Sequence, residues 1–237
     1  MIATTPLALL GFGFVLGLRH ALEADHLAAV STIVSTRRNV RGASLVGALW
    51  GLGHTVALLL VALAVVGLHA EIPPRLAASL ELGVSAMLIG LGLNVLWTLR
   101  RGGQLHHHAH THGRHLHVHP HLHAGAAPAA DGHHQVSSMR RPFLVGLVHG
   151  LAGSAALMLV VAASIPSPAM ALAYVAVFGI GSVGGMTAMS AMVGAPLAMV
   201  TARFARAETA LRAGAAVASV SIGVLVAWEI GVRIGVI

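Results

Sequence analysis

The sequence predicts an all-α polytopic membrane protein with six transmembrane helices, arranged as two inverted repeats of three helices each. The first observation is composition, because 57% of the 237 residues are hydrophobic, only 9% are charged, and the mean hydropathy is +0.85. Such values are typical of a membrane protein and unlike those of a soluble domain. The second and third observations are six long apolar segments and a short sequence match between the two halves.

Six apolar segments follow one another along the chain, at 5–35, 42–68, 76–99, 143–165, 168–200 and 210–235. Each is long enough for the ~20 residues that a membrane helix needs. The first and fifth are longer than one crossing requires, so we expect these helices to be tilted, kinked or broken. Glycines mark where they could unwind, at Gly11, Gly13 and Gly17 in the first and at Gly179, Gly181, Gly184 and Gly185 in the fifth. No basic residue precedes Arg19, which favours a retained helix over a cleaved signal peptide.

The arginines predict how the helices are oriented. All 14 basic residues are arginine, and the first, third and fifth loops hold most of them, whereas the second and fourth hold only Arg75. Because short cytoplasmic loops are enriched in basic residues, we expect these three loops to be cytoplasmic and both termini to lie outside. The same distribution accounts for the net charge of +7, so we expect no nucleic-acid partner. The chain has no cysteine, which excludes thiolate metal sites and disulfides.

The two halves of the chain repeat. Residues 14–22 read FVLGLRHAL and residues 143–151 read FLVGLVHGL, with five of nine positions identical at an offset of 129. Next, WGLGHT at 50–55 parallels FGIGSV at 178–183. The predicted units are a first repeat at 1–99, a histidine-rich loop at 100–141 and a second repeat at 142–237. Because three helices are an odd number, the repeats would have opposite orientations, an arrangement typical of secondary transporters with a substrate site near the midplane.

The stretch RHALEADH at 19–26 places five ionisable side chains inside the first apolar segment. Such groups cost several kcal/mol near the bilayer centre unless they are paired or face a cavity, so they indicate function. Two imidazoles beside a carboxylate suit borderline divalent metals, which makes His20, Asp25 and His26 candidate ligands. On a straight helix at ~100° per residue these three would not face one ion, so we expect local unwinding or a site completed by neighbouring helices. Arg19 and Glu23 have the spacing of a mutual ion pair; interhelical hydrogen bonding is the structural alternative for the whole cluster.

Two further histidines are expected near the same region. His54 lies in the second helix, next to the first in the predicted repeat, and is a candidate ligand or part of the ion pathway. His149 is the repeat counterpart of His20 and is a candidate metal ligand or gate, as is Glu23. The fifth segment carries Met186, Met189 and Met192, whose spacing favours packing over a site for soft metal ions.

The third loop contains twelve of the 17 histidines. From His115 to His123 they alternate with other residues, and an extended chain would place neighbouring imidazoles of this run ~7 Å apart on one face. The composition predicts an accessory metal-binding loop without ordered structure in the absence of metal. Its histidines are His106, His107, His108, His110, His112, His115, His117, His119, His121, His123, His133 and His134.

The segment RHALEADHLAAV resembles the signature helix of the nickel/cobalt transporter family, whose pattern runs roughly R-H-A-x-D-A-D-H-I. His20, Asp25 and His26 match its H-x-x-x-x-D-H core, whereas Glu23 and Leu27 differ conservatively. LGHT at 52–55 resembles the second motif of the family, which implies a role for His54. A histidine-rich cytoplasmic loop resembles the efflux branch, and short six-helix members are linked to the nickel supply of urease.

These observations predict a multi-pass secondary transporter of the cytoplasmic membrane, not an enzyme, that moves Ni²⁺ and also Co²⁺. The metal is substrate, and no permanently bound cofactor is expected. The resemblance implies nickel-enzyme maturation proteins as partners. Import is favoured over export because an inward-moving divalent cation gains ~4.6 kcal/mol per 100 mV, twice the value for a single charge.

Four alternatives remain open at the level of sequence. A proton-coupled Ni²⁺/Co²⁺ efflux protein would use the same ligands in the opposite direction. A membrane-anchored metal sensor or chaperone would need only the histidine-rich loop. A haem or redox protein would take its axial ligands from His20, His54 and His149. An anion exporter would use Arg19 as its substrate ligand.

Overall fold

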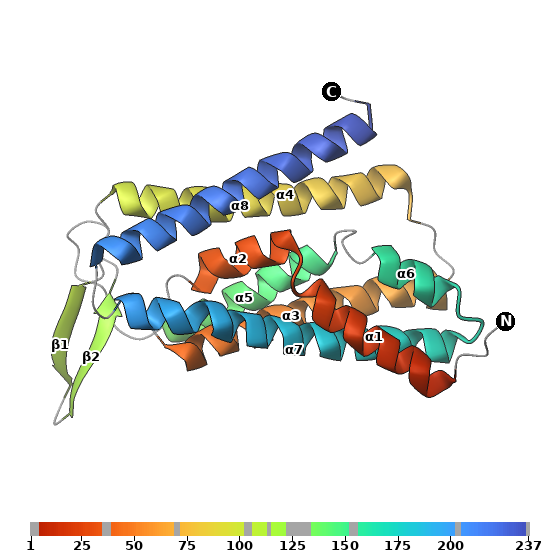
Figure 1. The fold of residues 1–237 in the computed structure, drawn as a ribbon, viewed down its shortest axis with the longest axis horizontal. Helices are drawn as coiled ribbons and strands as arrows, with labels where there is room; N and C mark the ends of the chain where they lie inside the picture. The colour runs from red at the N-terminus through yellow and green to blue at the C-terminus, as the bar shows by residue number, and fades with distance from the viewer. Residues whose placement is uncertain are drawn as a thin grey trace.

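A computed structural model of the protein is an elongated helical bundle (Figure 1). It describes residues 5–34, 39–68, 72–101, 106–112, 115–121, 134–151, 156–201 and 205–235. The elements are α1 (Pro6–His20), α2 (Ala24–Val34), α3 (Val40–Ala62) with a π-helical end η1 (Leu63–Gly67), α4 (Pro74–Arg100), β1 (His106–His112), β2 (His115–His121), α5 (His134–Gly150), α6 (Ala156–Ala163), α7 (Pro168–Thr201) and α8 (Ala205–Arg233).

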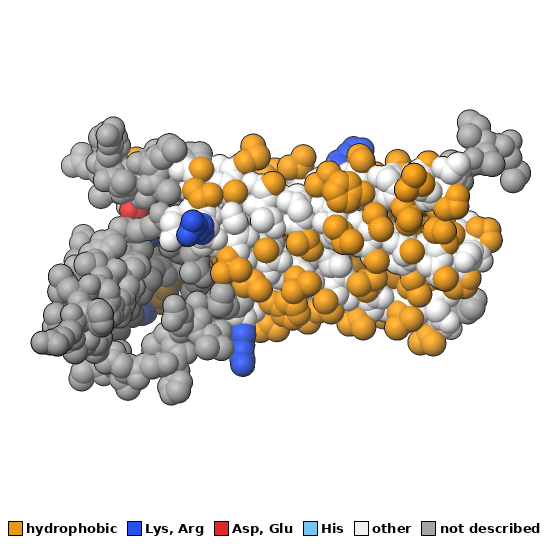
Figure 2. All heavy atoms as spheres, turned by 90° about the horizontal axis from the view of Figure 1, so that it is seen from below, with side chains coloured by type: hydrophobic (Ala, Val, Ile, Leu, Met, Phe, Trp, Pro, Cys, Tyr) orange, Lys and Arg blue, Asp and Glu red, His pale blue; other side chains and the backbone are white. Residues whose placement is uncertain are grey.

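The described helices include four that are long and apolar enough to cross a membrane: Val40–Gly67, Pro74–Arg100, Pro168–Ala195 and Ala207–Arg233. The bent pair of α1 and α2 makes a fifth crossing if it is counted as one span. Large apolar side chains such as Leu225 and Trp228 are exposed, and Figure 2 shows hydrophobic side chains spread along the bundle. Such a surface suits lipid rather than water, so the protein is a helical, multi-pass membrane protein. A sixth crossing stays a prediction, because residues 152–155 between α5 and α6 lie outside the described part.

The first apolar segment is broken, as its length predicted. Helix α1 begins at Pro6, where the Thr5 hydroxyl accepts a hydrogen bond from the backbone N–H of Ala8 (3.3 Å), and it ends at His20. Three residues, 21–23, separate it from α2, and the two helix axes differ by 56°. The break therefore falls after the glycines of α1 and directly within the cluster of ionisable residues.

The fifth apolar segment is not broken, and the expectation that its glycines could unwind it was wrong. Helix α7 is continuous from Pro168 to Thr201. A Cβ atom at Gly181 would collide with the backbone carbonyl of Phe14, and one at Gly185 would meet Ala21. These glycines therefore serve close approach of α7 to α1, which is a common use of small residues between membrane helices.

Two helix crossings are built in the same way. Where α1 crosses α7, Gly17 lies against the backbone of Phe178, and Gly181 lies against that of Phe14. Where α3 crosses α5, Gly53 lies against the backbone of Phe143. Gly146 completes this second crossing by lying against the backbone of Trp50. In both crossings each helix thus supplies at least one glycine, and the two backbones touch.

The remaining long helices, α4 and α8, form a pair at the side of the bundle (Figure 1). The Ser219 hydroxyl donates to the backbone carbonyl of Leu88 (2.9 Å), and the Arg233 guanidinium pairs with the Glu81 carboxylate. Helix α2 contacts both α4 and α8 and so connects this pair to the rest of the bundle. Helices α3 and α8 run in one direction along the long axis, and α4 and α7 run in the other (Figure 1).

The buried apolar residues form two clusters. The first includes Val30 of α2, Trp50 of α3 and Met186 of α7, and the second includes Leu58 of α3 and Phe178 of α7. Each cluster contributes one aromatic ring, Trp50 or Phe178, to the group of histidines described below. Packing was the expected role of the methionines in α7, and Met186 and Met189 are indeed buried in the first cluster, whereas Met192 is exposed.

The described part of the histidine-rich loop contains regular structure, which the sequence did not lead us to expect. Strands β1 and β2 pair in antiparallel register from His106 opposite His121 to His112 opposite His115, at one end of the molecule (Figure 1). In both runs histidine recurs at every second position, which is the side-chain period of a β-strand. Two residues separate the runs in the sequence, a length typical of a β-hairpin. Helix α5 begins at His134, before the apolar segment predicted from 143. His123 and His133 lie outside the described residues.

Candidate metal centre

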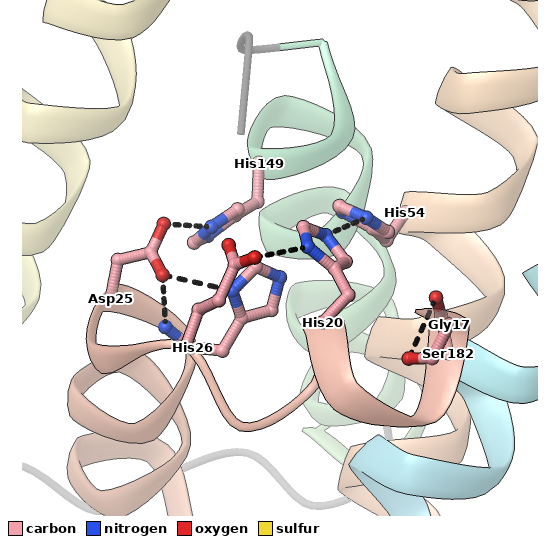
Figure 3. A network of polar contacts seen from close by, with 8 residues as sticks. Gly17, His20, Asp25, His26, His54, His149 and Ser182 are labelled. Carbon is pink, nitrogen blue, oxygen red and sulfur yellow. Dashed lines mark hydrogen bonds and ion pairs between the residues drawn. The ribbon is translucent and has the colours of Figure 1, made fainter. Parts of the chain in front are cut away.

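Four histidines, one from each of four helices, meet at the break between α1 and α2 (Figure 3). His20 is the last residue of α1, His26 lies in the first turn of α2, and His54 comes from α3. The fourth, His149, comes from the end of α5. All four side chains are at most 4% exposed. Because α1 stops at His20 and the chain turns before α2 starts, residues that could not share one face of a straight helix now surround one space.

The first part of the cluster joins α1 to α3. Nε2 of His20 lies 3.1 Å from Nε2 of His54, and Nδ1 of His20 lies 3.0 Å from Oε1 of Glu23. A carboxylate that accepts the Nδ1–H of an imidazole leaves its Nε2 lone pair free for a metal ion and fixes the ring. For metal–nitrogen bonds of about 2.0–2.1 Å, two ligand nitrogens lie roughly 3.0–3.4 Å apart on one ion, so the Nε2 separation suits shared coordination.

The second part of the cluster is organised by Asp25. Its Oδ1 accepts from the backbone N–H of His26 (2.8 Å) and lies 2.9 Å from Nδ1 of the same residue. Its Oδ2 lies 3.0 Å from Nε2 of His149. Asp25 is also in the first turn of α2, where the partial positive charge of a helix N-terminus stabilises a carboxylate. One carboxylate thus holds two imidazoles from different helices.

Several ring nitrogens in the cluster lack a partner. Nε2 of His26, Nδ1 of His54 and Nδ1 of His149 are buried and make no hydrogen bond to any residue that the structure describes. Buried polar atoms are nearly always satisfied, so each of these demands an explanation, such as a binding site for an ion. Ligand atoms of His20, His26 and His54 lie within 4.8 Å of one another, and so do those of Asp25, His26 and His149. Imidazole nitrogen and carboxylate oxygen together are a ligand set for borderline divalent metals.

The sequence identified the members of this cluster correctly as neighbours. His20, Asp25, His26 and His54 come together, and His149 joins them from the second half of the chain. The proposed ion pair between Arg19 and Glu23 was wrong, because Glu23 bonds to His20 and Arg19 is exposed. Spacing of four residues brings side chains together only on a continuous helix, and α1 ends between these two residues.

Two aromatic residues of the cluster were missed by the sequence reasoning. The Trp50 ring centroid lies 5.3 Å from that of His26 and 5.6 Å from that of His149. The Phe178 ring lies 5.4 Å from His20. A signal existed, because Trp50 and Phe178 are the first residues of the matching motifs WGLGHT and FGIGSV. Both rings are apolar neighbours of the imidazoles.

The side chains of the loop histidines lie outside the described part of the structure, so their expected role in metal binding stays a prediction. The same holds for the sidedness of the loop and of both termini.

Comparison with known proteins finds one similar protein over nearly the full length of the chain. No family model matches, and no solved structure matches. The urease accessory protein UreH of Bacillus sp. (strain TB-90) is 32% identical over 229 residues, which cover 97% of this chain and 94% of that protein. This similarity extends over both halves and the loop between them. The chain is therefore a multi-pass membrane protein, not an enzyme, and belongs to the family of the urease accessory protein UreH.

Proposed function

We propose that this protein is a secondary transporter that carries Ni²⁺, with Co²⁺ as a second substrate, across the cytoplasmic membrane and into the cell. The observation that carries the proposal is the cluster of four buried imidazoles and one carboxylate, inside an apolar bundle, with three ring nitrogens that have no hydrogen-bond partner among the described residues. Ionisable groups at such a depth are costly and mark ion pathways in membrane proteins.

The choice of nickel is supported by chemistry and by similarity. Neutral imidazoles and a carboxylate suit nickel, cobalt and zinc, whereas the absence of thiolates disfavours the softest ions. The similar protein from Bacillus is named as an accessory protein of urease. The resemblance of the motif at 19–26 to nickel/cobalt transporters, whose short members are linked to urease nickel supply, points the same way.

The inverted repeat is supported by the two glycine crossings. The contact of Gly17 with Phe178 corresponds, at the offsets of the repeat, to the contact of Gly146 with Trp50. The helix break after α1 corresponds to the boundary between α5 and α6. An inverted repeat with broken first helices would set the substrate site at the interface of the two halves, as in other secondary transporters.

In this mechanism His20, Asp25, His26 and His54 replace part of the hydration shell of the ion. The negative charge of Asp25 offsets part of the charge of the cation, and its bonds to His26 and His149 keep both rings in place. The rings of Trp50 and Phe178 lie beside the buried imidazoles, and such apolar surroundings strengthen the electrostatic attraction between ion and ligands. Ligand imidazoles must be unprotonated, so we expect binding to weaken as the pH falls.

Import follows from the energetics of the ion. A divalent cation that moves inward gains ~4.6 kcal/mol per 100 mV and needs no coupled ion. The hairpin lies at the end of the bundle where α4 ends and α8 begins, in agreement with arginine-rich loops on one side of the membrane (Figure 1). In this orientation the histidine-rich loop is cytoplasmic and takes up the ion after it has crossed.

The test is ⁶³Ni²⁺ flux into proteoliposomes with a negative interior, with the wild-type protein, His26→Ala, and Thr98→Ala as a control at a partly exposed position of α4, away from the cluster. We expect potential-driven accumulation in the wild type and the control, and none in His26→Ala. Flux that appears only with an imposed proton gradient would indicate export instead. No metal flux under either condition, or full flux in His26→Ala, would overturn the proposal.

A further inference from the structure

We infer that the cluster contains two metal-binding stations that share His26 and that the ion occupies them in turn. This inference rests on the proposed function. The first station consists of His20, His26 and His54, and the second of Asp25, His26 and His149. The notion of a single site with all five ligands does not follow from the geometry, because the groups whose ligand atoms lie within 4.8 Å of one another are these two triads.

The ring of His26 stands between the two stations. Its centroid lies 4.5 Å from that of His20 and 4.2 Å from that of His149, whereas His54 and His149 are 5.9 Å apart. One ring nitrogen, Nδ1, faces Asp25, and the other, Nε2, is buried without a partner. His26 therefore offers a nitrogen to each side, and its side chain is fully buried, so an ion bound to it is sheltered from solvent.

The stations differ in their chemistry. The first has three imidazoles, of which His20 is oriented by Glu23. The second has two imidazoles and the carboxylate of Asp25, which adds a negative charge. A neutral imidazole has one protonated and one unprotonated nitrogen, so His26 can bind an ion in one station at a time. When the ion passes from Nε2 in the first station to Nδ1 in the second, the ring proton of His26 moves from Nδ1 to Nε2. An ion that exchanges His20 and His54 for Asp25 and His149 never has to be fully hydrated or fully stripped of ligands.

The stations also differ in which part of the chain builds them. All three residues of the first station belong to the first half, on α1, α2 and α3. The second station needs His149, which is carried by α5 of the second half. A movement of α5 relative to α2 would therefore dismantle the second station and leave the first intact. Access to the ion from one side of the membrane or the other then depends on which station is complete.

The experiment compares metal binding with metal transport in four variants. His54→Asn removes a ligand of the first station, His149→Asn removes one of the second, the double variant affects both, and His26→Asn removes the shared ligand. All are made in a full-length background in which the twelve loop histidines are glutamine, so that loop binding does not mask the site. Binding is measured with ⁶³Ni²⁺ at equilibrium, and the geometry of bound metal with the visible absorption of Co²⁺. Thr98→Ala is again the matched control, and size-exclusion chromatography checks that each variant is folded.

We expect the unmutated background and the control to bind one ion per chain. Each single variant, His54→Asn and His149→Asn, should still bind one ion, because the other station keeps all three of its ligands. The affinity should fall by at most about 10–100-fold, no more than when a group that orients a metal ligand is lost. The two variants should give different Co²⁺ spectra, because one retains the carboxylate station and the other the imidazole station. Both should lose transport. The double variant and His26→Asn should lose binding altogether.

Three outcomes would overturn the two-station arrangement. Loss of binding in either single variant would mean one composite site, and identical Co²⁺ spectra in both would mean the same. Retained transport in either variant would mean that its station is not on the pathway. These results are distinct from failure of the proposed function, which would appear as an absence of nickel flux in the wild-type protein itself.

Discussion

The two glycine crossings share their packing but differ in their chemistry. At the crossing of α1 and α7, and at that of α3 and α5, two glycines let two backbones touch. At the crossing of α3 and α5 both helices carry a candidate ligand, His54 and His149, whereas at the crossing of α1 and α7 the first helix carries the candidate ligand His20 and the second carries Ser182. Ser182 of α7 stands where α3 has His54 and donates a hydrogen bond to the backbone carbonyl of Gly17 (3.3 Å). The two crossings therefore share their helix packing although they differ in the number of candidate ligands, so the packing does not depend on the ligands.

The largest effect should come from filling the crossings. Gly17→Val and Gly146→Val would each drive a side chain into the backbone of the opposite helix. The loss of folding stability should exceed the usual effect of overpacking, about 1–3 kcal/mol, because the backbone of a helix cannot move aside as a side chain can. We expect little folded protein in the membrane for either variant, as measured by detergent-solubilised monodisperse yield. Gly11→Val is the control, since nothing lies within 4 Å of that position. If one crossing tolerated valine and the other did not, the two would not be equivalent.

The next effect separates the chemistry from the scaffold. Asp25→Asn keeps the size of the side chain but removes its charge and one acceptor for the imidazoles of His26 and His149. We expect folded protein with nickel affinity lowered by about 10–100-fold, because the second station loses its charged ligand and His26 and His149 lose the group that orients them, while the three imidazoles of the first station remain. Ser182→Ala, on the ligand-poor crossing, should leave affinity unchanged. Affinity is measured by ⁶³Ni²⁺ binding. An equal loss of nickel affinity in Asp25→Asn and Ser182→Ala would contradict the conclusion that the helix packing is independent of the ligands.

A smaller effect is expected at Glu23. This carboxylate holds Nδ1 of His20 but is 46% exposed, so solvent can replace part of its interaction. Glu23→Gln retains an oxygen that can accept the same hydrogen bond, and nickel affinity should fall by no more than about tenfold. Glu23→Leu removes the acceptor and should cost more. The order of the two variants in a binding titration checks that Glu23 acts by orienting His20, and the reverse order would exclude this role.

The smallest effect should come from the peripheral pair of α4 and α8. Arg233 pairs with Glu81, but the arginine side chain is 57% exposed, and such exposed ion pairs contribute at most about 1 kcal/mol. Arg233→Ala should therefore lower the thermal stability slightly and leave transport unchanged. A large loss of transport would mean that the α4–α8 pair takes part in the ion pathway.

Much of the site could be predicted from the sequence because polar residues are conspicuous in an apolar chain. His20, Asp25 and His26 required a break to face one another, and the break exists at 21–23. The position of this break could not be predicted from the glycines. A glycine that lets a helix unwind and a glycine that lets a neighbouring helix pack closely cannot be distinguished in the sequence. For the same reason the continuity of α7 was missed, although Gly181 has a clear partner in Phe14.

Other features depended on contacts between distant segments. Trp50 and Phe178 are apolar residues in apolar helices, so only their place beside the imidazoles distinguishes them. The pairing of β1 with β2 required two alternating runs to meet, whereas their composition alone favoured an unstructured loop. The partner of the Glu23 carboxylate likewise depended on where α1 ends, because the end of the helix determines whether Arg19 or His20 lies close to Glu23.

The backbone contacts at the crossings have a consequence for how such sequences can diverge. At Gly17, Gly53, Gly146 and Gly181 no other residue fits without displacing the opposite helix. The residues at the ligand positions can be replaced when a related protein carries a different ion. The four glycines can be replaced only if the helices also move farther apart. We therefore expect a distant relative to keep this pattern of four glycines longer than it keeps the histidines, so that the pattern identifies the architecture even where the cargo differs.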